Sequence, residues 1–149
     1  WTTLIGAIRS HMRLRRYELV TFAAAQALKC AYCMLAHGAT LRKNFFNLEE
    51  MLALIADYRN AGLTPQEVAL MTFSRKITLQ AHLVNDKDYE ELRASGLTDA
   101  EILDVILACT ARSFFSKTLL AVDATPDKVY AELEPELLEK LSLGHPIEN

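Results

Sequence analysis

The chain has 149 residues, of which 51% are hydrophobic and 23% are charged, a balance typical of a folded globular protein and unlike that of a disordered one. This length predicts a single domain over residues 1–149 with a core of its own. The net charge of −3 offers no basic surface to nucleic acid, and charged residues recur too often for a membrane helix, so neither partner is expected.

Helices should dominate the fold, because only five Gly and four Pro interrupt a sequence rich in Ala, Leu, Glu and Lys, and no β-hairpin signature occurs. We therefore predict an all-α protein, with its first three helices over residues 4–12, 15–27 and 30–43. A cluster of basic residues spans the end of the first predicted helix and the start of the second. We expect it to be a solvated face, the alternatives being an anion site or pairing with acidic side chains; its members are Arg9, His11, Arg13, Arg15 and Arg16.

Helix-start signals mark the middle of the chain. Asn47 can cap a fourth helix, which Gly62 should end. Thr64 and Glu67 then form a capping box, and Pro65 suits the first helical position of the helix that follows.

The segment 62–67 aligns with 96–101, which fits either an internal repeat of helical hairpins or convergence on a good helix start. Apolar residues between 102 and 109 run almost all the way around the next helix. This pattern predicts burial in the core or in a subunit interface. Pro126 and Pro135 punctuate a final helical tail.

Two cysteines and a histidine share one face of the third predicted helix. At 100° per residue, Cys30, Cys33 and His37 fall within an arc of about 60°, and spacings of three and four bring helical side chains into contact. A local disulfide could form with little backbone movement. Three cysteines with only this pair close in sequence are no secreted disulfide framework, and no signal peptide is recognised, so a cytoplasmic location is expected.

The cysteine pair predicts redox chemistry. A Cys-x-x-Cys pair at a helix start beside an imidazole is a setting in which the pKa of a thiol falls below its usual value of about 8.5. Such thiolates attack peroxides or disulfides, and a sulfenic acid on one sulfur can condense with the other to give a disulfide that a reductant resets. His37 would shuttle the proton.

Glu18 is the candidate carboxylate for orienting the imidazole, because it is the only acid before the cysteines. In one unbroken helix it would lie about 18 Å from Cys30 along the axis, which is out of reach. Either the chain turns between the two, although residues 27–29 contain no Gly or Pro, or a neighbouring helix supplies the carboxylate.

Other interpretations of these residues stay open. The pair could be purely structural, or two thiolates, His37 and Glu18 could bind zinc, although structural zinc sites usually gather ligands from loops and repeat the pair. We expect Cys109 to be buried and inert, and His82 and His145 to lie at the surface. Several apolar side chains are expected to pack in the core and not to line a substrate pocket, namely Met34, Phe45, Phe46, Phe114 and Phe115.

The run Glu18-x11-Cys30-x2-Cys33-x3-His37 resembles the alkylhydroperoxidase (AhpD-like) branch of the carboxymuconolactone decarboxylase family. Segments 57–65 and 96–103 and the pair Phe114-Phe115 extend the resemblance to its peroxidase-related subgroup, over roughly residues 15–122. It implies a helical bundle of about seven or eight helices that assembles into dimers, trimers or hexamers. It also implies a thiol-dependent, haem-free alkyl hydroperoxide reductase that needs no metal or other cofactor.

The same resemblance implies roles. Cys33 would be the peroxidatic thiol, Cys30 the resolving thiol, and Glu18 with His37 the proton relay. Physical reasoning alone leaves the order of the cysteines open, because Cys30 is nearer the helix start and Cys33 nearer the imidazole. The implied partners are an organic hydroperoxide and a thioredoxin-like or lipoyl-bearing electron donor.

The sequence departs from the family at Tyr32, where some members have a second histidine, and at Ser116-Lys117, where Asn-Arg is common. These changes bear on substrate preference and local geometry more than on redox chemistry. The cysteine pair argues against lactone decarboxylation, because true decarboxylases of the family generally lack it. A redox sensor or disulfide-exchange protein without peroxide turnover, and a metal-binding module, are the alternative classes of function.

Overall fold

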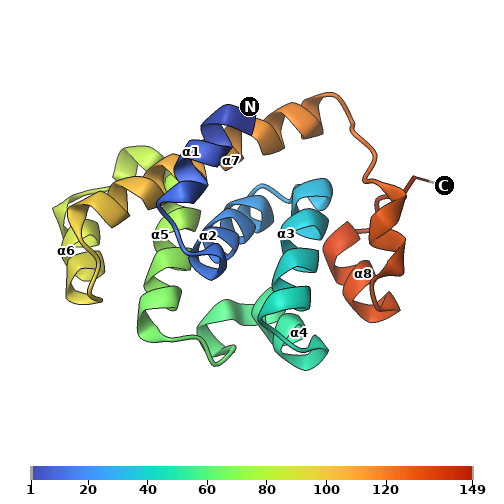
Figure 1. Cartoon of the computed structure of the whole chain (residues 1–149), viewed down its shortest axis with the longest axis horizontal. Coiled ribbons are helices and arrows are strands. Elements are labelled where there is room, and N and C mark those ends of the chain that lie inside the picture. Colours follow the sequence, from blue (N-terminus) through green and yellow to red (C-terminus); the bar gives the residue numbers. More distant parts are fainter. Residues whose placement is uncertain (1, 149) are drawn as a thin grey trace.

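Eight α-helices and three short 3₁₀ helices follow one another in the computed structural model, which describes residues 2–148 (Figure 1). The α-helices are α1 Thr2–Ser10, α2 Leu14–Ala27, α3 Ala31–Asn44, α4 Leu48–Asp57, α5 Pro65–Gln80, α6 Asp86–Ala94, α7 Asp99–Ala121 and α8 Pro135–Ser142. The 3₁₀ helices are η1 Tyr58–Asn60, η2 Ala81–Leu83 and η3 Lys128–Glu132. No strand occurs within this described range, so the prediction of an all-α fold with about seven or eight helices is confirmed.

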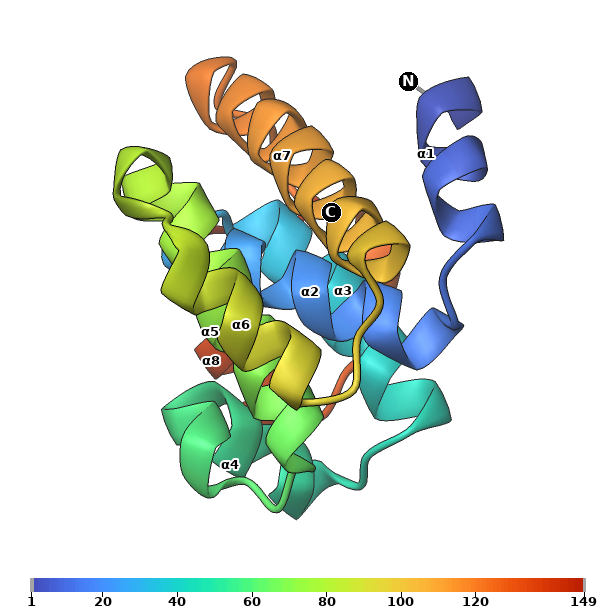
Figure 2. The same cartoon turned by 90° about the vertical axis from the view of Figure 1, so that its left-hand side faces the viewer.

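Helix α2 is the central element of the bundle. Nine of its 14 residues are buried, and it packs against α3, α5 and α7 (Figures 1 and 2). Ala23, Ala24 and Ala25 are fully buried, because their small side chains let the neighbouring helices approach closely. Helix α7 crosses the top of the bundle beside α1 and is the longest helix described, at 23 residues.

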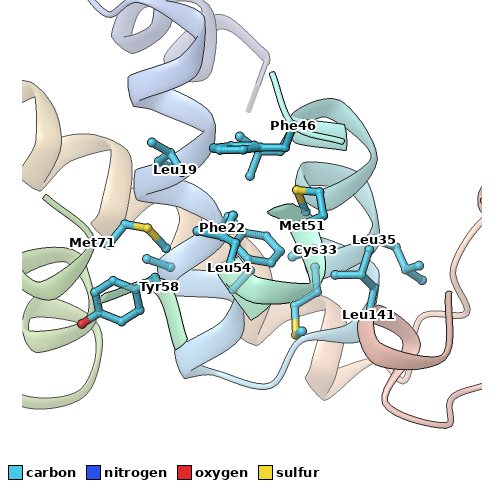
Figure 3. Close-up of a cluster of buried hydrophobic side chains, with 14 of the residues drawn as sticks. Leu19, Phe22, Cys33, Leu35, Phe46, Met51, Leu54, Tyr58, Met71 and Leu141 are labelled. Atoms are coloured by element: carbon cyan, nitrogen blue, oxygen red, sulfur yellow. The ribbon is translucent and has the colours of Figure 1, made fainter. Parts of the chain in front are cut away.

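Two clusters of buried side chains form the core. One cluster joins α2, α3, α4 and α8 and contains Phe22, Cys33, Leu54 and Leu141 (Figure 3). The other joins α1, α2, α5, α6 and α7. Cys33 therefore belongs to a packed interior and not to a surface loop.

The predicted helix starts are confirmed. Asn47, Thr64 and Thr98 each form a complete capping box with the residue three positions on. The aligned segments 62–67 and 96–101 also share backbone geometry, because Gly62 and Gly96 both have positive φ, at 71° and 95°.

The basic cluster is only partly the solvated face that we expected. Arg15 Nε lies 2.5 Å from Glu67, and Arg16 Nη1 lies 2.6 Å from Glu101. The capping-box glutamates of α5 and α7 thus each bind one of two neighbouring arginines near the start of α2, and the hydrogen bond from Arg16 holds the pKa of Glu101 at about 2. The alternative of pairing with acidic side chains is therefore correct for Arg15 and Arg16.

One further expectation needs correction, and a second is met on the core face of α7. Helix α4 ends at Asp57 and not at Gly62, because the Asp57 side chain accepts a hydrogen bond from the Arg59 amide and starts a 3₁₀ turn there. On α7, the apolar run faces the core at Ile102, Val105 and Ala108, whereas Leu103 and Leu107 on the other face are about half exposed. Within residues 2–148, no helix combines the length and apolar character needed to cross a bilayer.

Candidate active site

A tight turn between α2 and α3 brings Glu18 to the predicted site. Lys29 adopts the left-handed conformation with φ of 54°, the Cys30 amide donates to the Ala25 carbonyl at 3.0 Å, and the Lys29 amide donates to Gln26 at 3.1 Å. These two bonds form a Schellman motif in which lysine replaces the usual glycine, at a cost of about 1 kcal/mol. The chain therefore turns between Glu18 and the cysteines, which is the first of the two possibilities that the sequence left open.

Glu18 and His37 meet across the α2–α3 contact. Glu18 Oε2 lies 2.6 Å from His37 Nδ1, and both side chains are buried. Thr21 Oγ1 lies 3.2 Å from the same nitrogen, but its hydroxyl donates to the Tyr17 carbonyl at 2.7 Å. Nδ1–H must therefore donate to the Glu18 carboxylate, which fixes the orientation of the imidazole.

His37 is arranged as a proton acceptor. Burial lowers the pKa of His37, against the raising effect of the Glu18 hydrogen bond, so the ring is neutral at pH 7. With its proton on Nδ1, the ring presents an unprotonated Nε2, which is buried and has no hydrogen-bond partner among the described residues. A buried acceptor without a partner at the side of a cavity is suited to take a proton from a bound molecule.

The two cysteines have different environments. Cys30 is the N-cap residue of α3 and Cys33 lies in its first turn, and each is 1% exposed. The Cys30 thiol donates to the Cys33 sulfur, Ser116 Oγ lies 3.2 Å from that sulfur, and Arg112 Nη1 lies 3.6 Å from it.

These contacts separate the acidities of the two thiols. The hydrogen bond from Cys30, with those from Ser116 and the charge of Arg112, lowers the pKa of Cys33 to about 6, although burial opposes the shift. The same hydrogen bond, together with burial, raises the pKa of Cys30. Cys33 is therefore the thiol that ionises first.

A cavity of about 340 Å³ gives access to Cys33 and the Glu18–His37 pair. It is bounded by α1, α2, α3, α7 and η3, and its walls combine aromatic rings with two arginines. The lining residues are Ile5, Arg9, Tyr17, Glu18, Tyr32, Cys33, Ala36, His37, Thr40, Arg112, Phe115 and Tyr130.

The structure brings the four predicted site residues together as two pairs. Cys30 is hydrogen-bonded to Cys33, and Glu18 is hydrogen-bonded to His37. Within residues 2–148, neither nitrogen of His37 forms a hydrogen bond with a sulfur. The imidazole that we expected to lower the thiol pKa is therefore not the group that does so. Glu18 is engaged by His37, and no group of three or more metal-ligating side chains converges in the described part of the chain, so the zinc ligand set considered above is not assembled.

Sequence reasoning missed Arg112 and Ser116 as functional residues. Both come from α7, which is about 80 positions from Cys33 in the chain, so no local pattern pairs them with it. The available signal was their spacing of four, which places a charged and a polar residue on the otherwise apolar, buried face of α7. Phe114 is 66% exposed, so the expectation that it packs in the core is wrong, whereas Phe115 packs against the core and also lines the cavity.

Comparison with known proteins places the chain in a family. The sequence profile of the carboxymuconolactone decarboxylase family matches residues 1–76, half of the chain, and this region contains all four predicted site residues. No protein of curated function is significantly similar to the chain in sequence.

Two solved structures are similar in fold. An uncharacterized peroxidase-related protein from Silicibacter sp. TM1040 has a TM-score of 0.81 and 22% identity, over 88% of this chain and 70% of that one. An uncharacterized peroxidase-related protein from Ralstonia eutropha JMP134, described as an alkylhydroperoxidase AhpD core, has a TM-score of 0.73 and 23% identity, over 89% of this chain and 66% of that one. The chain therefore belongs to the carboxymuconolactone decarboxylase family and has the fold of peroxidase-related, AhpD-like proteins.

Proposed function

We propose that the protein is a thiol-dependent, haem-free peroxidase that reduces organic hydroperoxides at Cys33. The observation that carries the proposal is the low pKa of the Cys33 thiol, at about 6, on a cavity that also holds an oriented, neutral imidazole. At neutral pH such a thiol is mostly thiolate, which is the form that attacks a peroxide.

The oxidative step balances with the groups present. The Cys33 thiolate attacks the terminal oxygen of the hydroperoxide, an S–O bond forms, and the O–O bond breaks. His37 Nε2 accepts the proton that the Cys33 thiol loses on ionising and passes it to the departing alkoxide, so the products are an alcohol and Cys33 sulfenic acid. Arg112, held against the same sulfur at 3.6 Å, stabilises the negative charge before and during the transfer.

Cys30 completes the cycle. Its thiol already contacts the Cys33 sulfur, so it can attack the sulfenic acid, release water and form the Cys30–Cys33 disulfide with little movement. A dithiol donor of the thioredoxin-like or lipoyl-bearing kind then returns the disulfide to two thiols. Oxidation beyond the sulfenic acid is limited, because the resolving thiol is already in place.

The test is consumption of cumene hydroperoxide with dithiothreitol as reductant, comparing the native protein with Cys30→Ser, Cys33→Ser and the matched control Cys109→Ser. We expect both variants of the pair to lose turnover, Cys30→Ser alone to accumulate a trappable sulfenic acid, and Cys109→Ser to stay active. A native protein that forms a reversible Cys30–Cys33 disulfide but consumes no hydroperoxide would instead be a redox sensor or a disulfide-exchange protein.

We also propose that the protein is a homo-oligomer. The exposed face of α7 presents large apolar side chains one and two turns apart, of which Leu103 is 54% and Leu107 is 42% exposed. A second copy that covers this stripe would remove it from water. Light scattering of the native protein and of Leu107→Glu tests this, and a native monomer would contradict it.

A further inference from the structure

The two cysteines open onto different cavities. Cys33 lines the 340 Å³ cavity with Glu18 and His37, whereas Cys30 lines a separate hollow of about 100 Å³. The walls of this second hollow come from the end of α7, the segment after it and the chain beyond α8, and they include Leu120, Ala124 and His145.

Tyr32 lies between the two cavities, and among residues 2–148 it is the one that lines both. Its hydroxyl donates to Asp127 Oδ2 at 2.6 Å, and its ring packs edge to face on Tyr130 at 6.1 Å. These contacts tie the start of α3 to η3 and the residue before it, and they hold the ring in place between the two cysteines' cavities.

We propose that the two half-reactions use opposite sides of Tyr32: hydroperoxide reaches Cys33 through the larger cavity, and a narrow aliphatic dithiol attacks Cys30 through the smaller hollow. The hydroperoxide half rests on the function proposed above. The dithiol half requires only that Cys30 and Cys33 form a disulfide.

The exchange chemistry favours attack at Cys30. A donor thiolate that attacks Cys30 Sγ forms a mixed disulfide with it and breaks the Cys30–Cys33 bond, so Cys33 leaves as a thiolate. Ser116 and Arg112 stabilise that thiolate, and a thiol of low pKa is the better leaving group. The donor's second thiolate then attacks the donor sulfur of the mixed disulfide, Cys30 leaves and takes up a proton, and the donor becomes a disulfide.

The lining of the hollow suits a narrow aliphatic dithiol. Leu119, Leu120 and Pro126 give it an apolar wall, and the exposed imidazole of His145 is available to accept the proton of the donor thiol. Cys30 is only 1% exposed, so a donor must insert its sulfur to reach it.

Each half-reaction is measured alone, with two blocking variants for the smaller hollow and one for the larger cavity. Ala124→Phe fills the smaller hollow and Thr40→Phe narrows the larger cavity; Leu120→Trp, on the exposed face of α7, is a second block of the smaller hollow. Oxidation is followed in a single turnover with cumene hydroperoxide. For reduction, the disulfide is first formed with diamide, and its loss in dihydrolipoamide is followed by rapid alkylation and mass spectrometry.

We expect Ala124→Phe and Leu120→Trp to slow reduction about tenfold and to leave oxidation within about twofold, and Thr40→Phe to do the reverse. Reduction that is unchanged in both blocks of the smaller hollow, or slowed by Thr40→Phe, would overturn the proposal, because both reagents would then use the larger cavity. A native protein that hydroperoxide does not oxidise would overturn the proposed function and the hydroperoxide half, while the diamide-formed disulfide still decides where the dithiol attacks.

Discussion

Cys33 and Cys109 are both buried, at 1% and 0% exposed, and both lie within hydrogen-bond distance of a serine hydroxyl. Their acidities nevertheless move in opposite directions. Burial raises the pKa of Cys109, whereas the hydrogen bond from Cys30, with Ser116 and Arg112, lowers the pKa of Cys33 to about 6. Burial alone therefore does not decide whether a thiol in this fold is reactive.

The hydroxyls near Cys109 have their protons engaged elsewhere. Ser74 Oγ donates to the Val20 carbonyl at 2.7 Å, and Thr78 Oγ1 donates to the Ser74 carbonyl at 2.8 Å. The Cys109 thiol itself donates to the Ser74 carbonyl at 3.2 Å, which stabilises its protonated form.

At Cys33 the donors point at the sulfur, and one of them is a cation. Ser116 Oγ donates to the sulfur, and the Arg112 guanidinium lies beside it. The contrast indicates that the orientation of the surrounding protons, together with one buried charge, separates a thiol of lowered pKa from one of raised pKa. Four experiments can test this contrast.

Alkylation of the reduced protein by iodoacetamide should be at least about 100-fold faster at Cys33 than at Cys109 at pH 7, because a thiol of pKa near 6 is about nine-tenths thiolate there. The rate at Cys33 should fall about tenfold per pH unit below pH 6. Peptide-resolved mass spectrometry measures both. Parallel pH profiles at the two cysteines would remove the contrast.

Replacing the cation should move Cys33 toward Cys109. Arg112→Met is expected to raise the pKa of Cys33 and to slow its alkylation at pH 6 about tenfold, whereas Arg112→Lys should restore part of the rate, because it keeps the charge. Lys117→Met, at an exposed position of the same helix, is the matched control and should leave the pH profile of alkylation unchanged. A profile that Arg112→Met does not shift would assign the acidity to Cys30 and Ser116 alone.

Stability should depend on pH through Cys33 but not through Cys109 in the neutral range. The pKa of Cys33 is about 6 in the folded protein and ordinary in the unfolded chain, so its stabilising contribution is complete above the ordinary pKa and is lost as pH falls through 6. The free energy of unfolding of the native protein, relative to Cys33→Ser, should therefore rise between pH 6 and 8 by about 1 kcal/mol per unit. Urea unfolding of the reduced proteins measures this rise. The free energy of unfolding of the native protein relative to Cys109→Ser should not change over the same pH range.

The smallest effect is expected from a single hydroxyl. Ser116→Ala removes a donor to Cys33 and should slow its alkylation at pH 6 about threefold, whereas Ser74→Ala should leave the slow reaction of Cys109 unchanged, because the Ser74 proton goes to Val20. Alkylation kinetics with circular dichroism as a folding control distinguish the two. Equal changes at both cysteines would show that the hydroxyls act through packing and not through proton orientation.

Local patterns were enough to predict much of the fold. Capping boxes at Asn47, Thr64 and Thr98 are determined by residues three apart, and all three form. The placement of Cys33 and His37 on α3 likewise follows from helical spacing, although Cys30 is the N-cap residue and not part of the helix, and the sequence indicated Glu18 as the carboxylate that meets the imidazole.

Features that depend on tertiary packing could not be predicted from local patterns. The turn at Lys29 uses the left-handed conformation without glycine, so its signal was absent from the sequence. Arg112 and Ser116 reach Cys33 only because α7 packs across the bundle, and the end of α4 depends on a side-chain hydrogen bond of Asp57. Each of these depends on a competition between local preference and the packing of distant segments.

Helix α8 packs directly against α3 at Gly38. A side-chain carbon at Gly38 would lie 2.7 Å from Leu141, so α8 rests directly on the backbone of α3, one residue beyond His37. Brief detachment of α8 would therefore uncover the helix that carries the imidazole, and the amide protons of the two helices should exchange with solvent as one cooperative unit. Helix α8, which lies outside the region matched by the family profile, would then determine how long α3 stays ordered.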